Sequence, residues 1–151
     1  MPTAILTANK TLQLDNQLCF ALYSASLAMT KLYKPLLKTL GMTYPQYLAM
    51  LVLWEGDKLM VSELGDRLSL DSGTLTPLLK RMEAAGWIGR LRDVQDERRV
   101  FITLTPAGQS LKKEALVVPS CILSATQCTL PELIALTQQV QALRGRLIAS
   151  L

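Results

Sequence analysis

The residues with the most reactive side chains in this sequence are three cysteines, Cys19, Cys121 and Cys128. A cysteine acts as a nucleophile in its thiolate form, and peroxides oxidise an accessible thiolate first to a sulfenic acid. The three positions do not have the spacing of a zinc site, and we expect no metal and no cofactor. Free thiols persist in a reducing compartment, so we expect a cytoplasmic protein.

Cys19 lies within residues 16–30, a stretch without a single charged side chain. On such an apolar helix a cysteine is most often a small buried hydrophobic residue. The preceding Asp15 and Asn16 are candidate helix caps, and such a cap would place Cys19 in the first turn, near the positive end of the helix dipole. These residues alone leave both a reactive and an inert Cys19 open.

The sequence contains no histidine. A Ser-His-Asp triad, a Cys-His pair and a His-ligated metal site are therefore excluded within one chain. No glycine-rich phosphate loop is present either. Together these observations argue against an ordinary hydrolase, kinase or metalloenzyme, and we do not expect an enzyme.

The stretch from Val61 to Gly86 predicts two short helices joined by a tight turn. Leu64 and Leu68 fall on one face of the first helix, with Ser62 as its N-cap. Residues 70–71 form the turn. Because both helices are short and the turn is tight, the arrangement is typical of a helix-turn-helix.

The second of these helices is expected to open near Ser72. Pro77 lacks an N–H, so the helix should begin within about one turn before it, and Gly86 should end it as a left-handed cap. Its buried stripe consists of Leu75, Leu78, Leu79 and Met82. Its outer face carries small hydroxyls and then basic side chains, namely Ser72, Thr74, Thr76, Lys80 and Arg81.

A hairpin is predicted directly after the second helix. Val100, Ile102 and Leu104 alternate with other residues at the period of a strand with one buried face. Residues 89–94 can form the partner strand, with a charged loop at 95–98. The charged side chains of the hairpin are Arg90, Arg92, Arg98 and Arg99 against Asp93, Asp96 and Glu97. A basic hairpin beside a helix-turn-helix indicates a winged helix that binds DNA.

Composition adds limits to this prediction. With 151 residues we expect one domain, and a hydrophobic fraction of 50% with 19% charged residues favours an extensive oligomer interface. The net charge is +4, and residues 80–99 hold six basic against four acidic side chains. No signal peptide is recognisable, and no uncharged apolar run reaches the ~18 residues of a membrane span, so we expect no membrane partner.

Helices are predicted on both sides of the winged helix-turn-helix, which we assign to residues 56–105. Residues 1–12 read as a loose arm, and the flanking helices are expected at 15–40, at 44–54, after Thr105 and after Thr129, with a break at Pro119. Residues 12–55 and 106–151 would be dimerisation helices, because their apolar faces have no domain of their own to cover. A two-fold dimer would read the half-sites of palindromic double-stranded operator DNA.

Five stretches of the sequence carry a resemblance to a known family: LDNQLCFALYS at 14–24, YKPLL at 33–37, TYPQYL at 43–48, LDSGTLTPLLKRME at 70–83 and DERRV at 96–100. They resemble the MarR family of transcriptional regulators, in particular its organic hydroperoxide resistance regulator (OhrR) branch. The resemblance implies a mainly α fold with a small β-hairpin wing, assembled as an intertwined homodimer. It also implies a repressor that releases its operator when organic hydroperoxides oxidise Cys19.

The resemblance further implies roles for individual residues. Tyr33 and Tyr44 would hydrogen-bond the Cys19 thiolate and the peroxide. Either Cys121 or Cys128 would resolve the sulfenic acid as an intersubunit disulfide. The apolar walls of the peroxide pocket would come from Phe20, Leu22, Tyr23, Met50 and Trp54.

On the DNA side, we expect Ser72, Thr74 and Thr76 near base edges and phosphates. Lys80 and Arg81 should neutralise backbone phosphates. At the wing tip, Arg98 should enter the minor groove, with Asp96 holding the arginines in place. Arg90 and Arg99 complete the expected DNA-binding set.

Two alternatives stay open at this point. One is a MarR-type regulator released by a small phenolic ligand, with an inert Cys19. The other is a thiol peroxidase that uses Cys19 catalytically, although the winged helix would then have no explanation. The operator, the preferred peroxide and the physiological reductant cannot be read from the sequence.

Overall fold

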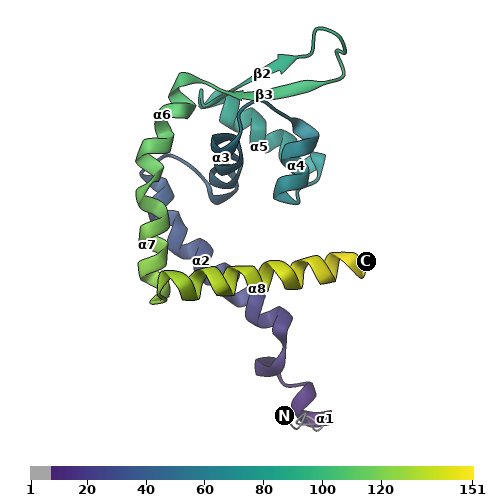
Figure 1. Ribbon diagram of the computed structural model, residues 1–151, viewed down its shortest axis with the longest axis vertical. Helices are drawn as coiled ribbons and strands as arrows, with labels where there is room; N and C mark the ends of the chain where they lie inside the picture. Colours follow the sequence, from purple (N-terminus) through teal and green to yellow (C-terminus); the bar gives the residue numbers. More distant parts are fainter. Residues whose placement is uncertain (1–7) are drawn as a thin grey trace.

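The computed structural model describes residues 8–151 and is mainly helical, with one small sheet (Figure 1). In chain order the elements are α1 (Ala8–Thr11), a 3₁₀ turn η1 (Leu14–Asn16), α2 (Leu18–Lys38), α3 (Tyr44–Glu55), β1 (Leu59–Met60), α4 (Val61–Leu68), α5 (Ser72–Ala84), β2 (Ile88–Arg92), β3 (Val100–Leu104), α6 (Pro106–Ala115), α7 (Val117–Thr126) and α8 (Leu130–Ala149). The predicted fold class is confirmed. Most of the predicted arm lies outside the described residues, and its described end contains α1.

The winged helix-turn-helix forms the upper part of Figure 1. Strands β2 and β3 make the predicted hairpin, although β2 covers residues 88–92 rather than 89–94. Strand β1 was not predicted. It pairs antiparallel with β3 through Leu59 and Met60, which gives the strand order β1-β3-β2.

The core of this lobe lies between α3, α4, α5 and the sheet. The predicted stripe of α5 is buried, and so are Leu64 of α4 and Ile102 of β3, both with 0% exposure. Complete burial of an aliphatic side chain contributes ~1.5–3 kcal/mol. The DNA-binding lobe therefore has a hydrophobic core of its own.

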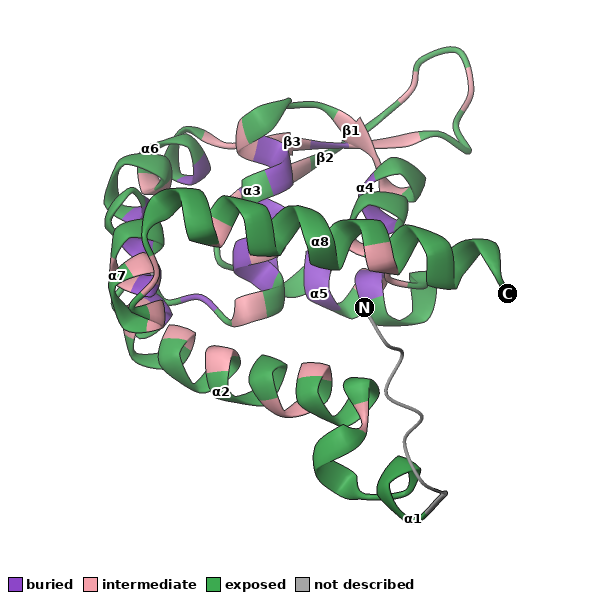
Figure 2. Ribbon diagram, turned by 60° about the horizontal axis from the view of Figure 1, so that its bottom comes forward, coloured by how far each residue is buried: buried purple, intermediate pink, exposed green. Residues whose placement is uncertain are grey.

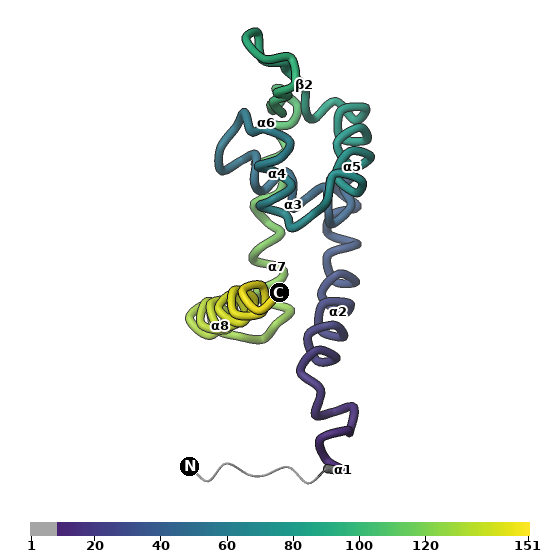
Figure 3. The backbone as a smooth tube through the Cα atoms, turned by 90° about the vertical axis from the view of Figure 1, so that its right-hand side faces the viewer, coloured from purple at the N-terminus to yellow at the C-terminus, as the bar shows by residue number. Residues whose placement is uncertain are grey.

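Helices α2, α7 and α8 extend away from the lobe. α2 and α7 pack side by side, whereas α8 runs across below the lobe and is seen end-on in Figure 3. No residue of α8 is buried, and in α2 only Leu37 is. Figure 2 shows both helices as mostly exposed. Their exposed apolar side chains include Leu18, Phe20, Tyr23, Leu27, Ile134, Leu136, Val140 and Leu147.

Most of the predicted helix ends are confirmed. Thr43 caps α3 in a capping box with Gln46, Thr105 caps α6, and Thr129 caps α8 in a capping box with Glu132. Gly86 has φ of 83° at the end of α5, and the Trp87 amide donates to the Met82 carbonyl, as in a Schellman motif. These ends depend on neighbours three to five residues away, which explains why the local sequence predicts them.

Two predicted caps are wrong. Met60 rather than Ser62 is the N-cap of α4, because pairing of Met60 with Phe101 keeps the chain extended up to that residue. Gln17 precedes α2 and makes no side-chain capping bond, so neither Asp15 nor Asn16 caps this helix. Residues 14–16 instead form their own 3₁₀ turn, and the side-chain amide of Asn16 donates to the Lys10 carbonyl.

The break after α6 occurs earlier than expected. It falls at Leu116, three residues before Pro119, which lies inside α7. A proline removes the hydrogen bond to the carbonyl four residues back, here that of Ala115, the last residue of α6.

No single helix within residues 8–151 is long and apolar enough to cross a membrane. By length and composition alone, α6–α7 taken together with α8 would be sufficient, but the two parts are bent by 92° relative to each other.

A close contact joins α6 to the rest of the lobe. The Thr105 hydroxyl donates to the Gly86 carbonyl at 2.6 Å, and the Thr105 amide donates to the Trp87 carbonyl at 3.0 Å. Gly108 lies so near that a Cβ there would be 2.1 Å from the Trp87 carbonyl oxygen. The Trp54 indole donates to the Gly108 carbonyl at 3.0 Å, so α3, α6 and the turn between α5 and β2 meet at one point.

Candidate DNA-binding surface and sensor site

The second helix of the helix-turn-helix, α5, begins at Ser72, the first residue of its polar face. Asp71 is its N-cap and accepts a hydrogen bond from the Thr74 amide at 2.8 Å. This bond, with others from Thr74 and Gly73, holds the pKa of the Asp71 carboxyl below its usual value. Pro77 lies in the second turn rather than the first, because the carbonyl that loses its partner belongs to the exposed Gly73.

The side chains expected to contact DNA lie on the outer face of α5. Ser72, Thr74, Lys80 and Arg81 are exposed, and Thr76 is half-buried. Since the core stripe faces inward, the hydroxyls and the two cations occupy one solvent-facing side of the helix. That arrangement can place hydroxyls near base edges and positive charges at phosphates.

The wing carries its arginines in different environments. The Arg98 side chain is 95% exposed, with its Nε 3.6 Å from the Asp96 carboxylate. The same carboxylate accepts the Arg98 amide at 3.1 Å, so Asp96 shapes the loop that presents Arg98. Arg90 instead pairs with Glu83 of α5 at 2.7 Å and ties the hairpin to that helix.

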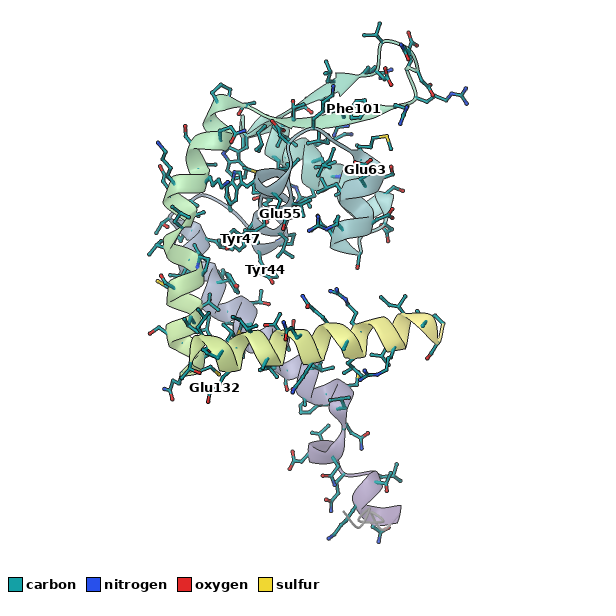
Figure 4. The ribbon with its side chains drawn as sticks, viewed as in Figure 1. Tyr44, Tyr47, Glu55, Glu63, Phe101 and Glu132 are labelled. Atoms are coloured by element: carbon teal, nitrogen blue, oxygen red, sulfur yellow. The ribbon has the colours of Figure 1, made fainter. Side chains whose placement is uncertain are left out.

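Three tyrosines form the candidate sensor cluster where α2 meets α3. The Tyr33 ring lies 4.8 Å from the Tyr44 ring and 5.8 Å from the Tyr47 ring, measured between centroids. Figure 4 shows Tyr44 and Tyr47 at the end of α3 nearest to α2 and α8. Burial, together with the two neighbouring phenols, raises the pKa of Tyr33 to about 12, and burial raises the pKa of Tyr44 and Tyr47. All three phenols are therefore protonated donors near neutral pH.

Cys19 is exposed and occupies the first turn of α2. Tyr33 follows it by fourteen residues on the same helix, which corresponds to about 21 Å along the helix axis. A single chain therefore does not bring the sulfur to the tyrosines that the resemblance assigned to it.

The predicted pocket residues are also distributed over the chain. Phe20 and Tyr23 are exposed on α2 and Leu22 is half-buried, whereas Met50 lies completely inside the core of the lobe. Trp54 lines a cavity of about 390 Å³ between α3 and α6–α7, with Tyr47, Leu51 and Ala115. A second cavity, of about 480 Å³, lies beside Tyr44 and is lined by residues of α2 and α3.

The two candidate resolving cysteines lie near the turn between α7 and α8. Cys121 is half-buried in α7. Cys128 is half-buried in the turn, where its amide donates to the Thr126 hydroxyl at 3.3 Å. All three thiols are free in the single chain.

Two residues were not predicted, Tyr47 of the sensor cluster and Gly108 at the contact between α6 and the lobe. Tyr47 is 97% buried and packs against Tyr33, and its position three residues after Tyr44 was the available signal. Gly108 gave no local signal, because its close contact is with Trp87, a distant residue in the turn between α5 and β2.

Comparison with known proteins decides the family. The family described as transcriptional regulator SarA/Rot matches residues 31–115. The organic hydroperoxide resistance transcriptional regulator of Bacillus subtilis (strain 168) is 55% identical over 116 residues, which cover 77% of this chain and 79% of that protein. The chain belongs to the OhrR branch of the MarR family. This MarR-family protein is a DNA-binding transcriptional regulator and not an enzyme, so the thiol peroxidase alternative is set aside.

Solved structures agree with this assignment of the MarR-family regulator. Reduced AbfR bound to DNA has 35% sequence identity and a TM-score of 0.75, covering 94% of this chain and 99% of that one. The disulfide-formed state of AbfR has 37% identity and a TM-score of 0.61, over 89% and 95% of the two chains. A MarR mutant from E. coli in complex with operator DNA, at 23% identity and a TM-score of 0.75 over 83% and 92%, supports the fold alone.

Proposed function

We propose that this protein is a homodimeric repressor that senses organic hydroperoxides through Cys19 and then releases a palindromic operator. The observation that carries the proposal is the exposed Cys19 in the first turn of α2, on a chain 55% identical to an organic hydroperoxide regulator. A cysteine reacts with peroxide through its sulfur, so the sulfur must be accessible, as it is at this position. Phenolic or other ligands would not require a thiol at this position.

The sensor site is completed across two subunits. Cys19 is about 21 Å along α2 from Tyr33 of its own chain. The surrounding α2 residues, including Leu18, Phe20 and Tyr23, are exposed apolar side chains that a single chain leaves uncovered. Pairing this end of α2 with the α2–α3 corner of a partner would bring Cys19 to the other subunit's tyrosine cluster.

The tyrosines then act as hydrogen-bond donors. Because the raised pKa values keep the phenols of Tyr33 and Tyr44 protonated, each can donate to the sulfur or to a peroxide oxygen. The cavity of about 480 Å³ beside Tyr44 has room for an alkyl group of the peroxide. Burying such a group contributes ~0.8 kcal/mol per methylene, which favours organic hydroperoxides over hydrogen peroxide.

The oxidation proceeds in two steps. The Cys19 thiolate attacks the terminal peroxide oxygen and the O–O bond breaks, so that the sulfur becomes a sulfenic acid, and the alkoxide takes up a proton from water and leaves as the alcohol. The thiol of Cys121 or Cys128 of the other subunit then forms the S–S bond and water leaves. This step requires the two Cα atoms to approach within ~7 Å. Movement of α7 and α8 toward α2 would change the separation of the two recognition helices and weaken operator binding.

Operator release tests the proposal. The reduced wild-type protein is titrated with a labelled duplex selected from a random pool, and cumene hydroperoxide is then added in equal amount. We expect release from the wild type and no release from Cys19→Ser. On a non-reducing gel, we expect a covalent dimer that disappears in Cys19→Ser and in one of Cys121→Ser or Cys128→Ser. Cross-linking that survives in the double Cys121→Ser, Cys128→Ser variant would contradict the disulfide step.

A second candidate function is release by a small phenolic ligand. The cavity of about 390 Å³ beside Trp54 favours it, because its lining is mostly apolar and also includes the charged side chains of Glu55 and Lys112. The two candidates differ in one result. A ligand-released regulator would lose its operator equally well with Cys19→Ser.

A further inference from the structure

The start of α4 and the wing enclose a concavity with an unusual lining. It has a volume of about 350 Å³ and is lined by Val61, Ser62, Arg90, Arg98, Arg99 and Val100, with Met60 at its edge. Every charged side chain of this lining is an arginine. We call it the arginine concavity.

The sheet explains why these residues meet. Strand β1 pairs with β3, so that Met60 lies opposite Phe101, and α4 begins at the next residue. Figure 4 shows Glu63, in the first turn of α4, close to the strand that carries Phe101. The first turn of α4 is therefore held beside the base of the wing by backbone hydrogen bonds.

The first turn of α4 presents donors to the concavity. The amide of Ser62 has no carbonyl partner within the helix, as at every helix start. Within the part of the chain that the structure describes, the Ser62 hydroxyl makes no hydrogen bond. The nearby Glu63 carboxylate points back to the Met60 amide, from which it accepts a bond at 3.2 Å.

The arginines are held by carboxylates that do not line the concavity. Arg90 pairs with Glu83 at 2.7 Å, and Arg99 lies 3.9 Å from Asp93. Each contact uses one edge of a guanidinium that has five N–H donors. The remaining donors are available to a further acceptor with several oxygen atoms.

We propose that the arginine concavity binds one phosphate of the DNA backbone, through the hydroxyl and amide of Ser62 and the side chains of Arg90 and Arg99, which leaves Arg98 free for the minor groove. The proposal rests on the DNA-binding function and deepens it. Oriented amides at a helix start and guanidinium groups both favour a phosphate. One phosphate held by α4 and the wing together fixes the angle of the wing, and hence the depth that Arg98 reaches in the minor groove.

A carboxylate placed in the concavity tests the proposal. Ser62→Asp should weaken binding of the reduced protein to the selected duplex at least about tenfold, and reduce the slope of log affinity against log salt by about one. Its melting temperature should equal or exceed that of the wild type, because an acid in the first turn favours the helix. Ser110→Asp adds the same charge on the exposed face of α6 and should leave affinity unchanged.

Two results would overturn the proposal. One is a Ser62→Asp variant with wild-type affinity and salt slope. The other is stabilisation of the wild type by inorganic phosphate, absent in Ser62→Asp, while both bind DNA equally, since the concavity would then serve a free anion. If the reduced wild type binds DNA but does not release it when peroxide is added, only the sensing proposal is contradicted, and the phosphate proposal is unaffected.

Discussion

The DNA-binding lobe buries its apolar side chains within one chain, whereas the terminal helices leave theirs exposed. The lobe, from α3 to β3, encloses Leu64, Leu79, Met82 and Ile102 with almost no exposure. Helix α8 buries no residue and exposes Leu136 at 51% and Val140 at 40%. The lobe is therefore complete in one chain, whereas α2 and α8 carry apolar faces of the kind that a partner covers.

The same difference separates the two proposed functional surfaces. The outer face of α5, the wing and the arginine concavity are each assembled within one chain. The proposed sensor residues are not, because Cys19 and Tyr33 are about 21 Å apart along one helix. A signal that forms only between subunits can change how two intact lobes are spaced without unfolding either of them.

The largest expected effect lies where the lobe joins α6. Gly108→Ala places a Cβ within 2.1 Å of the Trp87 carbonyl oxygen, so the backbone must shift, and we expect a loss of more than about 3 kcal/mol in the free energy of unfolding. Gly145→Ala is the control, because nothing lies within 4 Å of its Cβ in the chain. That control should be neutral or up to about 1 kcal/mol more stable. Equal stability of both variants in denaturant titrations would contradict the close contact.

The next effect concerns the uncovered helices. Leu136→Asp should destabilise a dimer by more than about 2 kcal/mol for each subunit, because it buries an unpaired charge at the interface. Leu91 on β2 is exposed to the same extent, 51%, and Leu91→Asp should leave the dimer intact. Sedimentation over a concentration series measures both. A wild type that sediments as a monomer at micromolar concentration would show that the apolar faces of α2 and α8 are not covered by a second subunit.

A smaller effect is expected at the tyrosines. Tyr33→Phe and Tyr44→Phe remove a donor to a charged sulfur, which costs ~1.5–3 kcal/mol and should slow oxidation by cumene hydroperoxide about tenfold to a hundredfold. DNA binding by the reduced variants should be unchanged. Ser110→Ala, which removes a hydroxyl from the exposed face of α6, is the control and should react at the wild-type rate. Rapid-mixing kinetics of thiol loss distinguish these results.

The smallest effect follows from the pKa of Tyr33. Because that pKa is raised to about 12 in the folded chain, the neutral phenol stabilises the fold fully below its ordinary value of 10.0. The contribution is lost as pH rises from about 10 to about 12. In Tyr33→Phe, stability should therefore fall less over this interval than in the wild type. Identical slopes of stability against pH would mean that the phenol ring is not buried as described.

Local patterns predicted the parts of the molecule that depend on near neighbours. The stripe of α5, the caps at Thr43, Thr105 and Thr129 and the αL glycine at Gly86 follow from residues three to five positions apart. Features that depend on distant residues were missed. Strand β1 forms only because Leu59 meets Ile102, and this pairing also moves the cap of α4 from Ser62 to Met60.

The candidate site shows the same limit. The polar face of α5 is visible in the sequence, because a helix places residues three and four apart together. The arginine concavity is not visible, since it combines α4 with a hairpin that begins some twenty residues later. For Cys19 and Tyr33 the sequence supplied the residue types through a family resemblance. Their distance along α2 is what indicates a site shared between two subunits.

A mixed dimer tests that central claim most directly. Cys19→Ser chains are combined with chains carrying both Tyr33→Phe and Tyr44→Phe, and the heterodimer is isolated with two different affinity tags. If the site forms across subunits, one site of the heterodimer pairs a native Cys19 with native tyrosines. Peroxide should then oxidise it at the wild-type rate, with half the wild-type amount of thiol lost. Oxidation as slow as in the double tyrosine variant would contradict the account, because it would place cysteine and tyrosines of one site on the same chain.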